Sequence, residues 1–293
     1  MENTKKKIPT RSFILQIYVL IISIILPIIT YKSLQLKFPS PNSLKSFTIG
    51  NITFFTFALI LEQILHIITM KLFPNLKDNI ILFGIYGGLA AGLFEEIGRL
   101  ISFKYILNTP EIRNNNINCV YYGIGHGGIE IWMIVSLTYV NNIMFSLKNN
   151  NETLYKDLEK VDNENKKKIY ESINGLINLD MLTCFACLYE RGMSLIIHIG
   201  NSIIVWYGIK NNNILFMLLL AIFNHTIVNA LTVIIFSFLQ KTKIPKGIQY
   251  FLVYCNLTLI TSYVAVISLY FCGKSNYVLE VVKFIQKNIK GDL

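Results

Sequence analysis

Two adjacent acids and an arginine interrupt an otherwise apolar part of the chain. Glu95, Glu96 and Arg99 lie near the middle of the apolar run 80–107. An ionisable group at the centre of a bilayer costs about 2.5–3.5 kcal/mol on insertion scales, so such groups are usually retained for function. Arg99 follows Glu95 by four residues and Glu96 by three, so it can pair with either. A buried Glu–Arg pair that only fixes helix packing is the alternative, but it does not require a second acid.

Two histidine motifs follow in later apolar segments. His126 is surrounded by glycines, which leave room for a close helix or a substrate, and Glu130 lies four residues further on the same helical face. A carboxylate in that position can orient an imidazole. His225 and Asn229 have the same spacing and could both donate hydrogen bonds to a developing oxyanion. Taken singly, each pair could also be a hydrogen-bonded packing contact.

Further polar residues interrupt two other apolar segments. Glu190, Arg191 and His198 lie in one of them, and Glu62 and His66 lie four apart in another. We expect the first group to form either a fourth wall of the site or, more simply, a polar seam that positions the other residues. The second pair is either supporting or structural. Isolated polar groups facing lipid would be costly, so the sequence predicts that these side chains converge on one interior cavity.

The composition indicates how these residues are held. The chain is 53% hydrophobic and 15% charged over 293 residues, whereas soluble domains carry about 25% charged residues. Several apolar runs exceed about eighteen residues, the length that indicates a transmembrane helix. We predict an all-α polytopic membrane protein with about seven helices (six to eight) around a polar intramembrane cavity, a single membrane domain over residues 1–293. The expected spans are 12–31, 47–73, 80–107, 117–147, 180–208, 214–239 and 247–272.

The positive charge suggests an orientation in the membrane. The net charge is +10, but the lysines flank the spans, so nucleic acid is not an expected partner. Their distribution predicts a cytoplasmic N-terminus in a multi-pass protein of the cell membrane. Residues 148–176 are expected to form a charged cytoplasmic hairpin. The basic C-terminal tail, 274–293, conflicts with this orientation: either its segment 277–289 forms an amphipathic helix on the membrane, or the number of spans differs by one. The Cys184–Cys187 pair is expected to be packing residues rather than a metal or redox site.

The polar motifs together resemble a known group of membrane enzymes. They are similar in type and order to the CAAX protease and bacteriocin-processing (Abi) superfamily of intramembrane glutamic peptidases, and within it to the YhfC-type membrane peptidases. The resemblance covers roughly residues 80–230, a peptidase-like core, and the glycine-rich histidine motif is its most specific part. The matching motifs are Glu-Glu-Ile-Gly-Arg at 95–99, Tyr-Gly-Ile-Gly-His-Gly-Gly-Ile-Glu at 122–130, Glu-Arg at 190–191 and His-x-x-x-Asn at 225–229.

The resemblance implies a role for each residue. In that superfamily the first glutamate activates a water with help from the motif histidine, and the later histidine and asparagine stabilise the tetrahedral oxyanion. Carried over, Glu95 is the base, His126 orients the water, and His225 with Asn229 forms the oxyanion hole. Arg99 would orient a glutamate.

Two departures from the superfamily pattern limit this reading. Prenyl-processing members place the arginine five residues after the first glutamate, and here the spacing is four. Glu95 and Glu96 therefore both remain candidates for the base. Those members also have phenylalanine where this chain has Tyr122, so cleavage of prenylated proteins is not assumed.

The leading hypothesis is an intramembrane endopeptidase that hydrolyses a membrane-associated peptide or protein with glutamate-activated water and no cofactor. A zinc-dependent variant would use His126, His225 and a carboxylate, since three N or O ligands plus water make a catalytic zinc site. It ranks second because no His-Glu-x-x-His motif occurs. A proton-coupled transporter and a non-catalytic scaffold on a peptidase-like fold are the hypotheses from other classes.

Overall fold

The computed structural model describes residues 6–154 and 161–273, and that part of the chain is helical without strands. Seven helices within it are long and apolar enough to cross a membrane, which confirms the predicted polytopic all-α class. The predicted amphipathic tail at 274–293 lies outside the described residues. The seven candidate spans are Thr10–Lys37, Ser43–Leu72, Ile80–Ile106, Ile117–Asn150, Met181–Lys210, Ile214–Gln240 and Lys246–Phe271.

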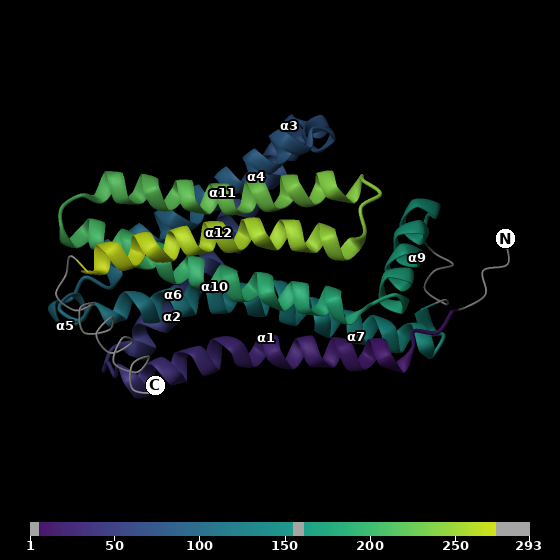
Figure 1. Cartoon of the computed structure of the whole chain (residues 1–293), viewed down its shortest axis with the longest axis horizontal. Coiled ribbons are helices and arrows are strands. Elements are labelled where there is room, and N and C mark those ends of the chain that lie inside the picture. The colour runs from purple at the N-terminus through teal and green to yellow at the C-terminus, as the bar shows by residue number, and fades with distance from the viewer. Residues whose placement is uncertain (1–5, 155–160, 274–293) are drawn as a thin grey trace. The chain divides into compact units, whose positions relative to one another are not determined.

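Three of these spans contain a short π-helical turn and are therefore divided into labelled parts (Figure 1). The second span is α2 (Ser43–Thr56), η1 (Phe57–Leu61) and α3 (Glu62–Leu72). The third is α4 (Ile80–Ile101) with η3 (Ser102–Ile106), and the fourth is α6 (Ile117–Glu130), η4 (Ile131–Ser136) and α7 (Leu137–Asn150). The others are α1 (Thr10–Lys37), α10 (Met181–Lys210), α11 (Ile214–Gln240) and α12 (Lys246–Gly273). Short elements between spans are η2 (Pro74–Asp78), α5 (Pro110–Arg113) and α9 (Asn163–Ile177).

The chain divides into two compact units. Unit 1 comprises Met1–Ile28 and Glu130–Arg191, and unit 2 comprises Ile29–Ile129 and Gly192–Leu293. The division cuts across the predicted core of residues 80–230, which stays a prediction.

Unit 1 is held together by an apolar cluster. Leu15, Val19, Val135, Tyr139 and Cys184 form the cluster. Cys184 is fully buried within it, as expected of a packing residue. The amphipathic helix α9 lies across the end of α7 (Figure 1) and turns Ile173 inward, while its lysines face outward. The predicted 148–176 hairpin is thus largely helical where it is described.

A capping residue fixes where α9 begins. The Asp162 carboxylate accepts a hydrogen bond of 2.9 Å from the backbone N–H of Asn165. Hydrogen bonds from the Asn165 backbone and side chain hold the pKa of Asp162 below its ordinary value. Such a cap satisfies an N–H group that the first helical turn leaves without a partner.

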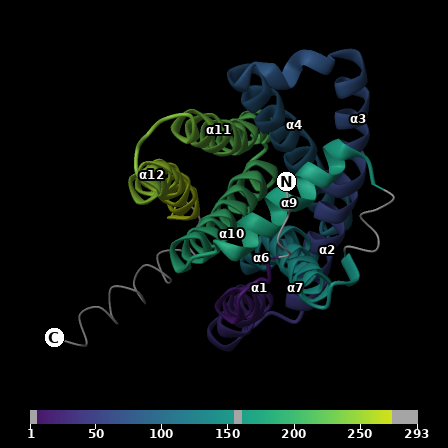
Figure 2. The same cartoon turned by 90° about the vertical axis from the view of Figure 1, so that its right-hand side faces the viewer.

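Unit 2 brings several helices into close contact at glycines. A Cβ atom added to Gly88 would lie 2.5 Å from the carbonyl oxygen of Thr226 and 2.9 Å from the backbone nitrogen of Ala230. Gly84 and Gly92 face α11 in the same way. The four-residue spacing of these small residues therefore lets α4 lie directly against α11, and the two helices are neighbours in Figure 2.

The glycines around His126 have the same effect on other helices. An added Cβ atom at Gly127 would meet the His198 side chain at 3.1 Å, and one at Gly123 would lie 2.7 Å from Cα of Ile199 in α10. Gly125 faces the backbone of α2 at Phe47. These glycines make room for neighbouring helices rather than for a substrate.

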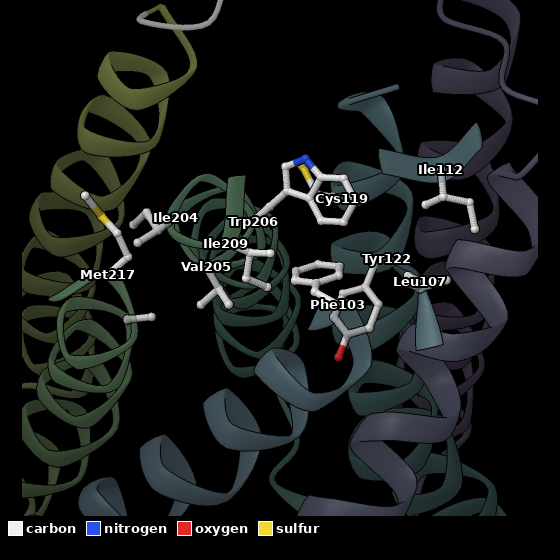
Figure 3. Close-up of a cluster of buried hydrophobic side chains, with 11 residues drawn as sticks. Phe103, Leu107, Ile112, Cys119, Tyr122, Ile204, Val205, Trp206, Ile209 and Met217 are labelled. Atoms are coloured by element: carbon white, nitrogen blue, oxygen red, sulfur yellow. The ribbon is translucent and has the colours of Figure 1, made fainter. Parts of the chain in front are cut away.

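An aromatic and aliphatic core closes one end of unit 2. Phe103, Tyr122, Val205, Trp206 and Met217 belong to it, and all are buried (Figure 3). The ring centroids of Phe103 and Tyr122 are 4.5 Å apart, and those of Phe103 and Trp206 are 5.1 Å apart. Because these residues come from η3, α6, α10 and α11, this core fixes the helices that carry the polar side chains described next.

Candidate functional site

The two adjacent glutamates of α4 have different surroundings. Glu96 is fully buried, and Arg99 donates to it through Nε (2.7 Å to Oε2) and Nη2 (3.1 Å to Oε1). Its Oε1 also receives hydrogen bonds from Nδ2 of Asn201 (3.1 Å) and Nδ1 of His225 (2.9 Å). The Glu96 carboxylate is thus surrounded by four hydrogen bonds from protein donors. Of the two acids that Arg99 could reach from the sequence, it hydrogen-bonds with Glu96.

Arg99 also ties α4 to α10. Its Nη1 donates to the backbone carbonyl of His198 at 3.2 Å and to the hydroxyl of Ser202. The guanidinium carbon lies 5.7 Å from the centre of the Tyr122 ring. A fully buried arginine with carboxylate, carbonyl and aromatic partners is compensated for the loss of water. These contacts favour a structural role for the side chain, and its role in orienting a glutamate for catalysis remains a prediction.

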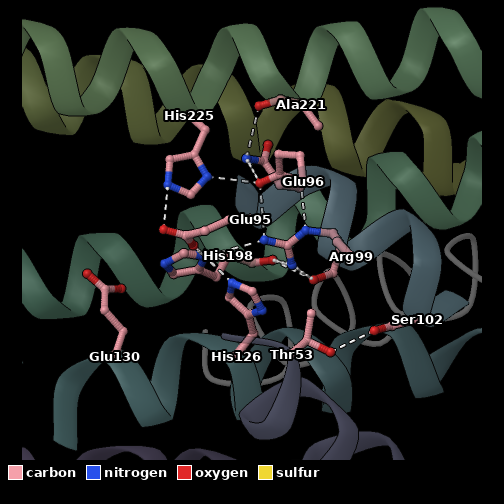
Figure 4. Close-up of polar contacts among 12 residues, drawn as sticks. Thr53, Glu95, Glu96, Arg99, Ser102, His126, Glu130, His198, Ala221 and His225 are labelled. Atoms are coloured by element: carbon pink, nitrogen blue, oxygen red, sulfur yellow. Dashed lines mark hydrogen bonds and ion pairs between the residues drawn. The ribbon is translucent and has the colours of Figure 1, made fainter. Parts of the chain in front are cut away.

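Glu95 lies at the centre of three imidazole rings (Figure 4). Nε2 of His126 is 2.9 Å from its Oε2, Nε2 of His225 is 3.5 Å from its Oε1, and Nδ1 of His198 is 3.9 Å from its Oε2. All four residues are buried, and they come from four separate helices of unit 2, α4, α6, α10 and α11. The structure thus brings Glu95, Glu96, Arg99, His126 and His225 together, as the sequence predicts.

The protonated nitrogens of the His225 and His198 rings can be assigned from their hydrogen-bond partners. Glu96, ionised beside Arg99, can only accept, so His225 carries a proton on Nδ1 and turns Nε2 towards the Glu95 carboxylate. Nη2 of Arg99 can only donate, and at 3.4 Å from Nδ1 of His198 it marks that nitrogen as an acceptor. The acceptor nitrogen of His198 therefore lies near the Glu95 carboxylate, an arrangement that a cation or a shared proton between them would stabilise.

This donor set fits a metal ion. Glu95, His126 and His198 each offer a ligand atom, and the three atoms lie within 4.8 Å of one another. Imidazole nitrogen and carboxylate oxygen are zinc ligands at about 2.0–2.2 Å. Nδ1 of His126 is buried and has no hydrogen-bond partner in the described part of the chain. The residues present could hold a metal with one open position, the arrangement of a catalytic site.

His198 is more central than the sequence indicates. From the sequence, His198 is expected in a polar seam, and the expected zinc ligands are His126, His225 and a carboxylate. In the structure His198 takes a place in the candidate metal group. Asn201 and Ser202, three and four residues further along α10, also reach the site. Their only sequence signal is that polar residues share one face of an apolar helix with His198.

Other predicted residues lie outside this cluster of contacts. Asn229 is half-buried, and its side chain makes no hydrogen bond with any residue that the structure describes. Nη1 of Arg191 donates to Glu130 at 2.6 Å, and its Nη2 donates to Glu190. These three residues belong to unit 1 and form an ion-pair network of their own. Their support of the site, and the role of Asn229 at an oxyanion, remain predictions.

The pair Glu62 and His66 is formed as the spacing suggests. Nε2 of His66 lies 3.1 Å from the Glu62 carboxylate, and its Nδ1 lies 2.7 Å from the hydroxyl of Tyr86 on α4. Tyr86 thereby joins α3 to α4. This contact favours a structural role for the pair.

Comparison with known proteins identifies the group to which this chain belongs. A curated relative, the "Uncharacterized membrane protein YhfC" of Bacillus subtilis (strain 168), is 30% identical over 179 residues, which is 60% of this chain and 67% of the relative. No solved structure matches the chain. The sequence model of one family, described as "YhfC intramembrane metalloprotease", matches residues 22–249, well over half of the chain. This description agrees with the zinc alternative rather than with the expected absence of a cofactor. The chain is therefore a member of the YhfC intramembrane metalloprotease family.

Proposed function

We propose that this protein is an intramembrane endopeptidase that hydrolyses a peptide bond of a membrane-associated substrate with the help of a metal ion. The observation that carries the proposal is the convergence of three imidazoles on the Glu95 carboxylate, with donor atoms of Glu95, His126 and His198 within 4.8 Å of one another. Zinc is the first candidate, because the ligands are nitrogen and carboxylate oxygen. The family description is consistent with this chemistry.

The ligand set and the base are separate parts of the proposed mechanism. Glu95, His126 and His198 would hold the metal, which would polarise a water or the scissile carbonyl as a Lewis acid. His225 is then the residue left to move the proton. Its Nε2 lone pair accepts a proton from the attacking water and later returns it to the leaving amine.

Glu96 supports His225 in this role. It accepts the Nδ1–H bond at 2.9 Å, so it fixes the tautomer and stabilises the imidazolium that forms when Nε2 takes up the proton. Arg99 keeps Glu96 ionised and fixed in place through two hydrogen bonds. The proton thus leaves water, rests on His225 and ends on the amine product, and the imidazole returns to its starting state.

A metal-free glutamic mechanism is the second candidate. In that mechanism Glu95 itself takes the proton from water, and His126 orients the water. The direct contact of 2.9 Å between Nε2 of His126 and the Glu95 carboxylate favours it, because the base and the residue that orients the water are already hydrogen-bonded to each other. The same substitutions test both mechanisms.

The lysine distribution adds a proposal about location. The excess of lysine on one side of the spans supports a cell-membrane protein with a cytoplasmic N-terminus. The substrate would then meet the site from within the bilayer, since the described site residues lie in candidate spans.

The test compares membrane peptides by proteomics in cells that carry the wild type, Glu95→Gln, His126→Gln or Glu171→Gln. Glu171 is an exposed residue of α9 and serves as the control. For a metallopeptidase, the first two variants lose both metal and product peptides, and a chelator abolishes activity that zinc restores. For a glutamic peptidase, Glu95→Gln loses product peptides and chelation has no effect. If no peptide differs between wild type and either site variant, hydrolysis is refuted, and a transporter or scaffold remains.

A further inference from the structure

Two buried asparagines extend the Glu96 contacts across three helices. Asn201 on α10 is fully buried, and Asn224 on α11 is 1% exposed. Nδ2 of Asn224 donates to Oδ1 of Asn201 at 3.3 Å, and Nδ2 of Asn201 donates to Oε1 of Glu96 at 3.1 Å. A further, longer bond of 3.4 Å links Nδ2 of Asn201 to the carbonyl of Ala221. A continuous chain of donors therefore runs from α11 through α10 to the carboxylate on α4.

The ionised Glu96 carboxylate determines which group donates and which accepts in this chain of hydrogen bonds. An ionised carboxylate only accepts hydrogen bonds, so Asn201 must present its NH₂ group to Glu96 and its oxygen to Asn224. Asn224 must then present its own NH₂ group to Asn201. This leaves Oδ1 of Asn224 buried and without a partner among the described residues. A buried acceptor left in that state costs free energy, so the chain of amides is maintained at a cost.

The side-chain amide of Asn201 helps to fix the position of one oxygen atom, Oε1 of Glu96. Oε1 of Glu96 receives three hydrogen bonds, from Arg99 Nη2 at 3.1 Å, Asn201 at 3.1 Å and His225 Nδ1 at 2.9 Å. Arg99, on the same helix, holds both carboxylate oxygens through two parallel bonds, which set the plane of the carboxylate. The bond from Asn201 ties Oε1 to α10 as well, and so keeps it where it accepts the hydrogen bond of His225.

We propose that Asn201, oriented by Asn224, is a positioning residue of the site, which fixes the Glu96 carboxylate and through it the Nδ1–H tautomer of His225. The catalytic consequence of this proposal rests on the proposed function, because only in that function does Nε2 of His225 accept a proton from water. Neither amide is among the residues that the motifs single out. Replacing an asparagine that merely bridged helices would lower stability without changing which ring nitrogen of His225 carries the proton.

The experiment uses the full-length protein in detergent with Asn201→Leu, Asn224→Leu and a matched control, Asn256→Leu. Asn256 is exposed on α12, and its side chain donates to the backbone carbonyl four residues earlier. The substitution Asn256→Leu therefore removes an asparagine from a span without touching the site. The first readout is peptide cleavage, with zinc affinity measured beside it by chelator competition. Loss of an outer residue that orients a site residue typically lowers activity about 10–100-fold, and we expect this for Asn201→Leu, whereas zinc affinity should be retained because Asn201 acts on Glu96 and His225 and not on the proposed ligands.

The second readout is independent of metal and of activity. The chain has four histidines, so ¹⁵N labelling of histidine gives few ring-nitrogen resonances, and His225→Gln assigns one set. In the wild type His225 should show a protonated Nδ1, and in Asn201→Leu a mixture of tautomers. Asn256→Leu should match the wild type in both readouts.

The outcomes separate this proposal from the proposed function. If Asn201→Leu keeps the His225 resonances of the wild type, Asn201 is not a positioning residue. If the wild type binds no zinc and cleaves no peptide, the metallopeptidase function fails, and the His225 resonances alone decide the positioning role. If Asn201→Leu does not fold, Asn224→Leu decides: altered His225 resonances support the proposal and unchanged ones overturn it.

Discussion

The two adjacent glutamates of α4 should respond differently to one substitution, the change of glutamate to glutamine. Glu96→Gln removes the charge opposite Arg99, which is fully buried. The new amide must also place an NH₂ group or a single oxygen where four donors now point. Glu95→Gln instead changes a carboxylate that faces imidazole nitrogens. The first substitution should therefore damage the fold, and the second should chiefly damage the chemistry.

The magnitudes follow from these contacts. Removing one partner of a buried ion pair costs about 3–5 kcal/mol, because the other charge stays buried and uncompensated. Glu96→Gln should lower the free energy of unfolding by that amount. Glu95→Gln should cost less, about 1.5–3 kcal/mol, the value of one hydrogen bond to a charged group. Glu171→Gln breaks an exposed pair with Lys167 at 4.0 Å and should cost at most about 1 kcal/mol.

The assay is equilibrium unfolding in mixed micelles, followed by the fluorescence of the two tryptophans. Peptide cleavage is measured on the same preparations. A double variant, Glu96→Gln with Arg99→Gln, removes both charges and should recover part of the stability lost in Glu96→Gln. The reasoning is refuted if Glu96→Gln is no more destabilising than Glu95→Gln, or if the double variant is less stable than Glu96→Gln alone.

Three further predictions use other parts of the molecule. Gly88→Val should destabilise the protein by about 1–3 kcal/mol through overpacking, and should lower cleavage, because its Cβ would meet the α11 backbone at Thr226 and Ala230. Gly87→Ala, with open space around its Cβ, is the control. Equal thermal stability of the two variants would contradict the prediction. Zinc at one hundred times its dissociation constant should raise the unfolding free energy by about 2.7 kcal/mol, and an absence of any shift on titration would argue against a metal site. Cys187→Ala should retain cleavage, since Cys187 packs beside an apolar cluster, and lost activity would indicate redox or metal chemistry there.

Much of this protein can be derived from the sequence because the relevant properties are local. A helix must satisfy its own backbone in lipid and needs a long apolar run to cross it. The seven spans therefore follow from residue type and length, and the structure confirms them. The cost of a charge in lipid likewise identifies Glu95, Glu96, His126 and His225 as residues of interest. The glycine spacing on α4 predicts a close helix, although it does not say which one.

The roles of these residues depend on how the helices are rotated against each other, and only the tertiary structure determines that. Glu95 and Glu96 are adjacent and point about 100° apart on a helix, so spacing alone leaves the partner of Arg99 open. The contact of the α4 glycines with α11 sets the rotation that directs Glu96 to Nδ1 of His225 and Glu95 to the other imidazole nitrogens, and Arg99 pairs with Glu96. His198 and Asn201 join the site for the same reason: contacts between segments about a hundred residues apart depend on packing, which no local pattern encodes.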